Sequence, residues 1–512
     1  MEQPHWSRRR FLVAGTQIAA AGMGLAACHA QAPAPPAGTR SEPADLDPVA
    51  LVRSFIRFDT SHNGEGGITR PHAEFLAAKW AAAGVPAEII PTPKVDNVHC
   101  VARISGTGAA AALLFLGHSD VVSVERERWT VDPYAGDVRD GFLYGRGALD
   151  MKGANAACMT ALLRHLSEGA RFDRDIVFVS DCDEEGGPYG TRWLAEHHWD
   201  KVSAGAVLTE GGWMLAQADG VTPMLATLTC QDKVFALVEL STTATTTHSS
   251  RPQPDSAVVR LNRAVARLSE YQPDVALSPL VQRHFEALAD ATGDDALAKA
   301  VRLMLSAKEQ PERNRAGAVV LARSPYPWLH NALMRPTLAY VTQNAGYRSN
   351  IIPGGARAQV NVRLLPGGPA VSRILDEMRA AIADDKVGMS LTGLPGEAPE
   401  AVLARIEAAI AATPSPYPAP SGPASAGTEV FTAWEAAVTA VHPQLKTAPT
   451  LFEAGTATGP WRAKGIPVYG LYPYIVDNDT LTRMHGNDER VGVEALRRGT
   501  DLMYALFAQF RV

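Results

Sequence analysis

The sequence predicts an α/β protein in which a mixed, partly parallel sheet is covered by helices on both faces, together with a second, smaller α+β domain. Strand-like and helical segments alternate between residues 98 and 208. The strands at 175–180 and 204–208 are nearly continuous apolar runs, which are typical of strands buried on both faces. After residue 232 the order changes to a β-α-β-β-α-β series interrupted by extra helical sequence, which indicates a second unit.

Apolar spacing and turn residues define the elements in chain order, and Ala83-Gly84 marks the end of an early helix. The first part is expected to hold helices at 46–58 and 71–83, strands at 98–104 and 112–116, a helix at 154–166, a strand at 175–180, a helix at 190–198 and a strand at 204–208. The second part is expected to hold a strand at 234–242, a helix at 255–269, a helical stretch at 277–310, strands at 337–342 and 356–365, a helix at 370–383 and a strand at 387–391. The closing elements are a helix at 428–442, a strand at 466–472 and a helix at 493–510.

The larger domain is therefore expected to be discontinuous, over 46–231 and 424–512. The smaller domain would be inserted at 232–400, and a Pro/Ser/Ala-rich connector would follow at 401–423. The net charge of −6 disfavours a nucleic-acid binder, because such proteins usually carry a basic excess. Five cysteines in 512 residues disfavour a disulfide scaffold. No apolar run of about 20 residues indicates a membrane-spanning body.

The N-terminus is typical of an export signal. Residues 1–27 place Arg8-Arg9-Arg10 before a small, apolar stretch, which resembles a twin-arginine signal. The stretch ends Leu25-Ala26-Ala27-Cys28, which resembles a lipoprotein cleavage site and predicts lipidation of Cys28. Residues 28–45 are expected to form a flexible tether. The prediction is an exported protein, periplasmic or membrane-anchored through lipid; the alternative is an uncleaved tail with an ordinary cysteine.

An exported chain meets an oxidising compartment, so a disulfide among the cysteines of the body is one possibility. No paired spacing supports it, and buried, unpaired thiols are the favoured interpretation. The four cysteines concerned are Cys100, Cys158, Cys182 and Cys230.

Polar residues of metal-binding types follow several predicted strands directly. His118-Ser119-Asp120 follows the first, Asp183-Glu184-Glu185 follows the second, and Glu210 follows the third. Ligands of open α/β sheets bind outside the carboxyl ends of strands, so these three clusters are expected at one edge. Asp150 precedes a helix, and His485 precedes the last helix.

Two histidines with several carboxylates suit Zn²⁺, Co²⁺ or Mn²⁺ better than a thiolate site would. Two neighbouring cations need a shared carboxylate, and hydrolysis needs a further carboxylate that accepts a proton from water. Glu184 and Glu185 fit this division into one base and one ligand. The signatures HExxH, GxSxG and Walker A are absent.

Each feature also has an ordinary structural explanation. Taken alone, Asp-Glu-Glu after a strand is more often a solvated turn, and a lone His-x-Asp is more often structural. Four other histidines are interpreted as structural only: His99, His165, His197 and His198. The conjunction of five ligand candidates in one strand-end context is what favours a metal site.

These residues lie in stretches that together resemble the M20 family of metallopeptidases. The matching stretches are 117–122 (GHSDVV), 144–153 (YGRGALDMKG), 183–187 (DEEGG), 209–212 (TEGG), 350–354 (NIIPG) and 485–490 (HGNDER). The resemblance implies a di-metal peptidase-like catalytic domain, here the larger domain, with an inserted lid or dimerisation domain. It also implies two divalent ions, with Zn²⁺ favoured and Co²⁺ or Mn²⁺ as alternatives.

The resemblance assigns roles to the site residues. His118 and Glu210 would hold one ion, Glu185 and His485 the other, and Asp150 would bridge them. Glu184 would be the general base that activates the bridging water and later the proton donor to the leaving amine. Asp120 would hydrogen-bond His118 and fix its tautomer.

Substrate-binding residues follow from the same resemblance. His248 would polarise the scissile carbonyl and, in family dimers, comes from the partner subunit. Asn350 and Arg363, together with Gly455 and Thr456, would hold the substrate's carboxylate. Two departures stand beside them: Asn361 replaces the usual acidic residue two before the arginine, and Ala457 stands where an Asp is common.

The sequence therefore predicts a two-metal hydrolase of amide bonds in short peptides or N-acyl amino acids with a free C-terminal carboxylate. An N-acyl-amino-acid deacylase rather than a peptidase is the alternative, because the chemistry is shared and only the acyl pocket differs. An inactive peptide-binding lipoprotein is remote, because no ligand or base has been lost. The expected partners are this small substrate, a second copy of the chain through the lid, and a membrane only through the lipid anchor.

Overall fold

The computed structural model describes residues 46–62, 66–393, 397–411 and 428–512. The predicted signal, the tether with Cys28, and much of the predicted connector lie outside these residues. Within the described part of the chain, no helix has the length and apolar character needed to cross a membrane.

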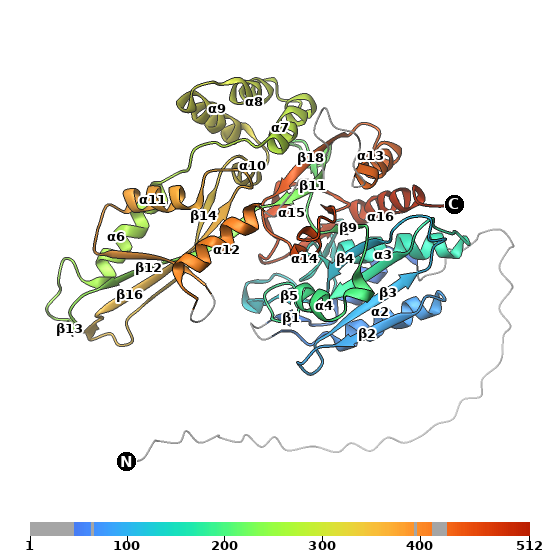
Figure 1. The fold of residues 1–512 in the computed structure, drawn as a ribbon, viewed down its shortest axis with the longest axis horizontal. Coiled ribbons are helices and arrows are strands. Elements are labelled where there is room, and N and C mark those ends of the chain that lie inside the picture. Colours follow the sequence, from blue (N-terminus) through green and yellow to red (C-terminus); the bar gives the residue numbers. More distant parts are fainter. Residues whose placement is uncertain (1–45, 63–65, 394–396, 412–427) are drawn as a thin grey trace, which may run out of the picture. The chain divides into compact units, whose positions relative to one another are not determined.

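A ten-stranded mixed sheet forms the centre of the larger domain (Figure 1). Its strand order is β2-β3-β8-β4-β9-β19-β11-β10-β20, and β18 pairs with β11. The strands are β2 (Ala87–Pro91), β3 (Val98–Ile104), β4 (Leu113–His118), β8 (Ile176–Asp181), β9 (Ala206–Thr209), β10 (Met214–Ala216), β11 (Pro223–Asp232), β18 (Lys446–Phe452), β19 (Val468–Gly470) and β20 (Ile475–Val476). The predicted mixed α/β architecture is confirmed.

Both faces of this sheet are covered, because alternate side chains of a strand point to opposite faces. In β8, Ile176 and Phe178 join one core cluster, whereas Val177 and Val179 join another. On the first face α3 packs against α1 and α16, and on the second α4 packs near α14. The helices of this domain are α1 (Pro48–Ile56), α2 (Arg70–Ala82), α3 (Lys152–Ser167), α4 (Thr191–His197), α5 (Trp199–Val202), α13 (Thr428–Val441), α14 (Gly459–Arg462), α15 (Asn478–Thr482) and α16 (Val493–Ala508).

Two small sheets flank the site. In one, β1 (Ser61–His62) pairs with β5 (Val121–Val122). In the other, β7 (Phe142–Tyr144) pairs with β6 (Val138–Arg139) and with β21 (Arg490–Gly492), a strand from the far end of the chain. The second sheet therefore brings the segment before Asp150 beside the segment after His485.

The smaller domain has an antiparallel sheet in the order β14-β16-β12-β17, with helices packed against it (Figure 1). A separate pair, β13 with β15, lies at the outer end of this domain. Its elements are β12 (Val234–Thr243), β13 (Thr247–His248), α6 (Ala257–Glu270), β14 (Thr337–Ala345), β15 (Ile351–Ile352), β16 (Gly355–Leu364), α11 (Val371–Ile382), β17 (Val387–Thr392) and α12 (Pro399–Ala411). Only Lys233 separates β11 of the large sheet from β12 of this one.

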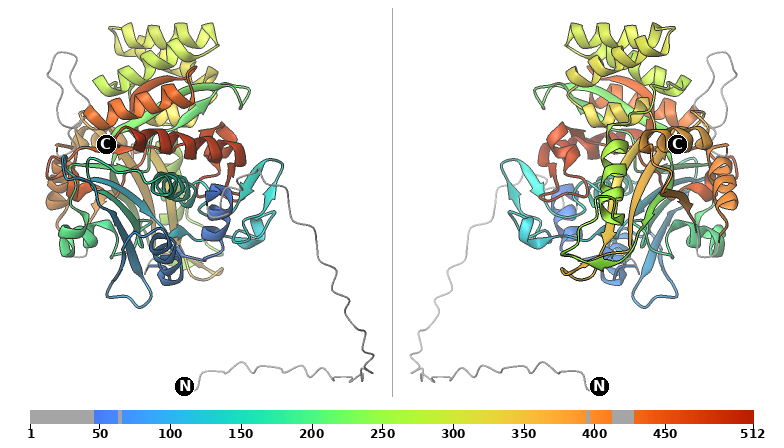
Figure 2. Two further views of the ribbon diagram at one scale, coloured as in Figure 1. Left: turned by 90° about the vertical axis from the view of Figure 1, so that its right-hand side faces the viewer. Right: turned by 90° about the vertical axis from the view of Figure 1, so that its left-hand side faces the viewer.

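Four helices are inserted between α6 and β14. They are α7 (Pro279–Ala291), α8 (Asp295–Ser306), α9 (Gln310–Arg323) and α10 (Pro327–Met334), and α7–α9 form one group in Figure 2. α7 packs against β18 and β11, so the insertion shares the core of the large sheet rather than that of the small one.

Two further findings bear on the sequence-based expectations. Residues 401–411, predicted as connector, lie in helix α12, whose Val402 and Ile406 join the core of the small sheet. The four described cysteines are free and buried, as the favoured interpretation held.

Candidate active site

Parallel pairing places the first three clusters together. β4 pairs in parallel with both β8 and β9, so the carboxyl ends of the three strands meet at one edge of the sheet. His118 is the last residue of β4, Glu184 and Glu185 follow β8 by three and four residues, and Glu210 follows β9 directly. The strand ends therefore converge as the sequence predicts.

Asp150 lies at the centre of the cluster, between two histidines. Its Oδ1 is 3.1 Å from Nε2 of His118, and its Oδ2 is 2.9 Å from Nε2 of His485. Glu210 Oε2 lies 3.7 Å from the first imidazole, and Glu185 Oε1 lies 3.2 Å from the second. The carboxylate thus spans two groups of ligand types, one with His118 and Glu210 and one with His485 and Glu185.

The carboxyl groups of the cluster repel one another. Burial, followed by repulsion from Asp150, raises the pKa of Glu210 to about 7. Burial and the charge of Glu210 raise the pKa of Glu184 well above its usual value, and burial also raises that of Glu185. Four carboxyl groups crowded out of water destabilise one another unless positive charge lies among them.

The histidines supply part of that charge as protons. Burial alone would lower the pKa of His118, but the adjacent carboxylates of Asp120, Asp150 and Glu210 outweigh it and raise the pKa well above 6.5. Burial would also lower the pKa of His485. Hydrogen bonds to Asp150 and Glu185 outweigh this effect and raise the pKa to about 11. A cation binds the same Nε2 atoms in place of a proton.

The donor set fits divalent ions. His118, Asp150 and Glu185 each offer a ligand atom within 4.8 Å of the others, and so do His118, Glu184 and Glu210. Oε1 of Glu185 is buried and faces Nε2 of His485 at 3.2 Å, so both atoms are turned toward the same point of the cluster. Imidazole nitrogens and carboxylate oxygens without thiolate are ligands for Zn²⁺, Co²⁺ or Mn²⁺.

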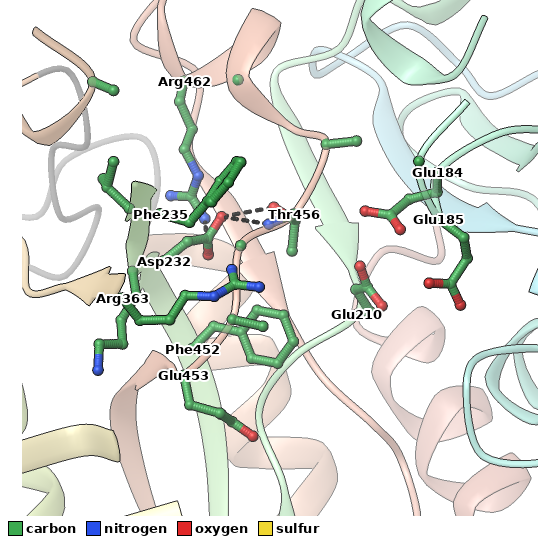
Figure 3. A pocket seen from close by; sticks show the side chains of 18 of the residues that line it. Glu184, Glu185, Glu210, Asp232, Phe235, Arg363, Phe452, Glu453, Thr456 and Arg462 are labelled. Carbon is green, nitrogen blue, oxygen red and sulfur yellow. Dashed lines mark hydrogen bonds and ion pairs between the residues drawn. The ribbon is translucent and has the colours of Figure 1, made fainter. Parts of the chain in front are cut away.

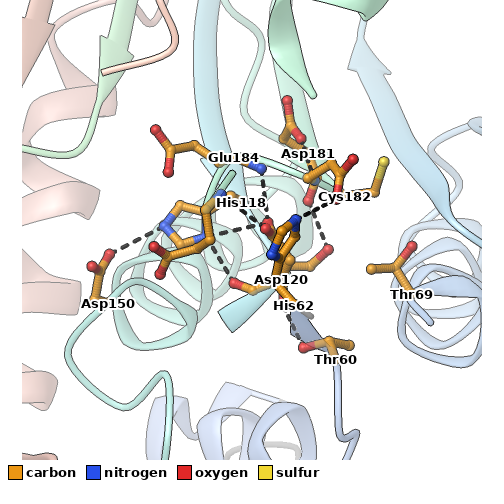
Figure 4. A network of polar contacts seen from close by, with 12 residues as sticks. Thr60, His62, Thr69, His118, Asp120, Asp150, Asp181, Cys182 and Glu184 are labelled. Carbon is orange, nitrogen blue, oxygen red and sulfur yellow. Dashed lines mark hydrogen bonds and ion pairs between the residues drawn. The ribbon is translucent and has the colours of Figure 1, made fainter. Parts of the chain in front are cut away.

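Asp120 supports both sides of this cluster (Figure 4). Nδ1 of His118 lies 2.9 Å from the backbone carbonyl of Asp120 and 3.6 Å from its carboxylate, so the carbonyl is the atom that holds the ring. The Asp120 carboxylate instead accepts the backbone N–H groups of Glu184 at 3.1 Å and Glu185 at 2.9 Å. The residue therefore fixes the turn after β8 as well as the imidazole.

A cavity of about 880 Å³ opens beside the cluster. Asp150, Glu184, Glu185, Glu210 and His485 line one side of it. The opposite side carries Arg363 and Thr456, together with Phe235 and Phe452 (Figure 3). Gly455, a third predicted substrate-binding residue, also lines the cavity, as do Ala454, Ala457 and Ala463.

His248 and Asn350 lie elsewhere. His248 is exposed on β13, and the N–H of Ser249 donates to the carbonyl of Asn350 at 3.0 Å, so the two lie together. Neither lines the cavity. The structure thus separates the predicted substrate-binding residues into two groups, one at the cavity and one at the outer end of the smaller domain.

Several residues at the site have no signal in the sequence. The hydroxyl of Tyr472, on the segment after β19, lies 2.9 Å from Asp150 Oδ1 and 3.1 Å from Glu210 Oε2. Asp232 binds both Arg462 at 2.9 Å and the hydroxyl of Thr456 at 2.7 Å, which holds the 455–458 loop at the cavity. Apolar strands and short loops contain many such residues, and spacing does not distinguish these.

A sheet edge with two imidazoles, four carboxylates and an adjoining cavity defines a hydrolase of the metallopeptidase and amidohydrolase class. The chain belongs to the peptidase family M20/M25/M40, whose model matches residues 114–509.

Similar proteins agree with this assignment. A probable carboxypeptidase S-like 2 of Dictyostelium discoideum is 28% identical over 402 residues, which cover 77% of this chain and 70% of that protein. The human N-fatty-acyl-amino acid synthase/hydrolase PM20D1 is 27% identical, with 77% and 73% covered. The solved M20 family metallo-carboxypeptidase Sso-CP2 of Sulfolobus solfataricus shares the fold, with a TM-score of 0.61, 16% identity and coverage of 91% and 99%.

Proposed function

We propose that the chain hydrolyses the amide bond of N-acyl amino acids or short peptides that carry a free carboxylate, using two divalent ions, most favourably Zn²⁺. The observation that carries the proposal is Asp150, whose two oxygens each face a different imidazole, 3.1 Å and 2.9 Å away. His118 and Glu210 would hold one ion, and Glu185 and His485 the other.

The ions, when bound, polarise the scissile carbonyl and make water a stronger acid. Glu184 then takes the proton of the attacking water and passes it to the leaving amine. Glu184 is half-buried beside Glu210 and lines the cavity, so its carboxyl lies where it can reach a substrate. The backbone contact to Asp120 keeps it there, because the turn that carries Glu184 cannot shift without breaking that hydrogen bond.

Arg363 is the proposed partner of the substrate's carboxylate. Arg363 lines the cavity and is half-buried, and this burial lowers the pKa of its guanidinium. Among the described residues no carboxylate forms an ion pair with it, and its guanidinium carbon lies 5.6 Å from the ring centre of Phe235. A planar guanidinium that no carboxylate of the described residues engages can bind the carboxylate of a substrate through two parallel hydrogen bonds. Gly455 lies beside it, and a Cβ there would lie 3.8 Å from Nη1 of Arg363 and 3.3 Å from the carbonyl oxygen of Lys233, so a longer side chain would occupy the space next to the guanidinium.

The apolar part of the cavity favours an N-acyl amino acid over a charged peptide. Phe235, Phe452 and Ala457 line it, and Ala457 replaces an acidic residue common in the resembled family. An acyl chain gains about 0.8 kcal/mol for each CH₂ that it buries against such a wall. The name of the human relative, which describes N-fatty-acyl amino acids, supports this choice.

A hydrolysis screen tests the proposal. N-acyl amino acids of increasing chain length and unblocked dipeptides would be compared with their C-terminal amides, after chelation and reloading with Zn²⁺, Co²⁺ or Mn²⁺. We expect metal-dependent cleavage of the free acids and weak cleavage of the amides. Equal rates for acids and amides would contradict the role of Arg363, and unchanged activity after chelation would contradict the metal dependence.

We further propose that a second copy of the chain completes the site. His248 and Asn350 lie together but away from the cavity, so they would act on the cavity of a partner subunit. Strand β14 is an exposed edge that could pair with the same strand of another copy. Mixing inactive Glu184→Gln chains with inactive His248→Ala chains should restore activity through hybrid dimers. Two inactive parents whose mixture stays inactive would contradict this arrangement.

We also propose that the chain is exported and anchored by lipid at Cys28. The support is the sequence of residues 1–28 alone, with its paired arginines and the Leu-Ala-Ala-Cys stretch. Fractionation of cells expressing Cys28→Ala should move the protein from the membrane to the soluble exported fraction. Unchanged membrane association in that variant would contradict the anchor.

A further inference from the structure

Arg146 and Glu489 form a buried ion pair behind the candidate metal site. The side chain of Arg146 is 2% exposed and that of Glu489 is fully buried, and Nη1 of the arginine donates to Oε2 of the glutamate. The guanidinium also lies over the ring of Trp129, with 5.3 Å from its carbon to the ring centre. Neither residue lines the cavity, so a direct contact with substrate does not explain the pair.

Glu489 holds the segment that carries the bridging carboxylate. Its Oε1 accepts the backbone N–H of Leu149 at 2.8 Å and that of Asp150 at 3.0 Å. Two hydrogen bonds to an ionised acceptor fix the backbone at the point from which the Asp150 side chain projects. Since the Glu489 carboxylate is turned toward the backbone and Arg146, it is not a ligand itself.

Arg146 holds the segment that carries the second histidine. Its Nη2 donates to the carbonyl oxygens of Gly486 at 2.9 Å and His485 at 3.3 Å. His485 has a φ of 59°, in the left-handed region of the backbone that residues other than glycine rarely adopt. Its side chain is 48% exposed, so packing alone does not fix the imidazole. The arginine therefore stabilises the turn that aims His485 at Asp150.

We propose that the Arg146–Glu489 pair positions the outer half of the metal site, the half formed by Asp150, Glu185 and His485. The ion pair links segment 145–150 to segment 485–489 and so fixes the position of each relative to the other. The inner half depends on it less, because His118 and Glu210 are fixed by β4 and β9. The inference rests on the proposed two-metal function and assigns Arg146 and Glu489 as positioning residues within it.

Zn²⁺ binding to the full chain tests the inference. After chelation, titration calorimetry with Zn²⁺ is expected to show two binding steps on the wild-type protein. In Arg146→Lys a positive charge remains beside Glu489. The lysine lacks the planar guanidinium whose Nη2 donates to the carbonyl oxygens of His485 and Gly486. We expect one step to weaken about 10–100-fold and the other to stay unchanged. At saturating Zn²⁺ the variant should recover kcat, because the reacting groups are intact.

Arg490→Lys is the matched control. Arg490 also uses both arms, donating to the Tyr144 hydroxyl at 2.9 Å and pairing with Asp479 at 2.6 Å, and among the described residues its side chain makes no hydrogen bond to 145–150 or 485–489. Both binding steps should match those of the wild-type protein. If Arg146→Lys fails to fold, Glu489→Gln provides the same comparison, because its amide oxygen can still accept from the backbone while the ion pair is lost.

The outcomes separate the two proposals. Two wild-type affinities in a folded Arg146 or Glu489 variant would overturn the positioning role and leave the proposed function standing. Equal weakening of both steps would also overturn it, because the inner half would then depend on the pair as strongly as the outer half does. Fewer than two ions on the wild-type chain would overturn the proposed function itself, and with it this inference.

Discussion

The inner and outer halves of the site around Asp150 are built by different means. In the inner half, His118 is 2% exposed at the end of a central strand, and Glu210 follows the neighbouring strand. In the outer half, His485 is 48% exposed on a loop with a left-handed backbone. The sheet fixes the first half, whereas a buried ion pair fixes the second. A di-metal site can thus combine a rigid ligand set with one that opens to the substrate.

Asp150→Ala gives the largest expected effect, because both halves share this residue. We expect loss of both bound ions and a fall in kcat/KM of about 10⁴-fold or more. Metal analysis of the purified, folded variant measures the first effect and a hydrolysis assay the second. Two ions retained in Asp150→Ala would contradict the bridging role and remove the basis for comparing the two halves.

Glu184→Gln separates chemistry from metal binding. The amide cannot accept a proton, so kcat should fall about 10²–10⁴-fold while metal content stays near that of the wild-type protein. Parallel metal analysis and steady-state kinetics provide the measurement. Turnover close to the wild-type rate would exclude Glu184 as the base, and a lost ion would make it a ligand instead.

His118→Ala and His485→Ala compare the two halves directly. Each should remove one ion. In the metal-free protein, His118→Ala should also lower the melting temperature by several degrees, because losing a buried, hydrogen-bonded group costs about 1–3 kcal/mol. His485→Ala should lower the melting temperature less, because its half-exposed side chain makes its contacts with Asp150 and Glu185 partly in water. Equal melting temperatures for the two metal-free variants would contradict the difference between the halves.

Tyr472→Phe should have the smallest effect. Its hydroxyl contacts Asp150 and Glu210 but would not bind metal itself. We expect the inner ion to bind about tenfold more weakly and the outer ion to bind as before. Calorimetry with Zn²⁺ resolves the two steps. Weakening of only the outer step would show that this tyrosine supports the other half.

The ligands that directly follow strands could be predicted from the sequence. His118, Glu185 and Glu210 follow apolar strands, and because parallel strands end at one edge, their convergence could be expected. His485 has no such relation to the sheet, and only the resemblance to a family pointed to it. Tyr472 could not be found, because a tyrosine near a strand is most often an ordinary core residue.

The inserted helices show another limit. Their apolar spacing predicts helices in the region of 277–310, but periodicity shows only that a helix has an apolar face and not which surface it covers. α7 packs against β18, which is more than 150 residues away in the chain. Helix α12 was likewise not predicted, because the Pro-rich composition of the residues after it made the whole of 401–423 resemble a connector.

The most direct test of the two-metal site is anomalous diffraction from crystals of the protein loaded with Zn²⁺. Two peaks are expected, one between His118, Asp150 and Glu210 and one between Asp150, Glu185 and His485. A single peak, or a pair in which Asp150 contacts only one ion, would contradict the bridging role of Asp150.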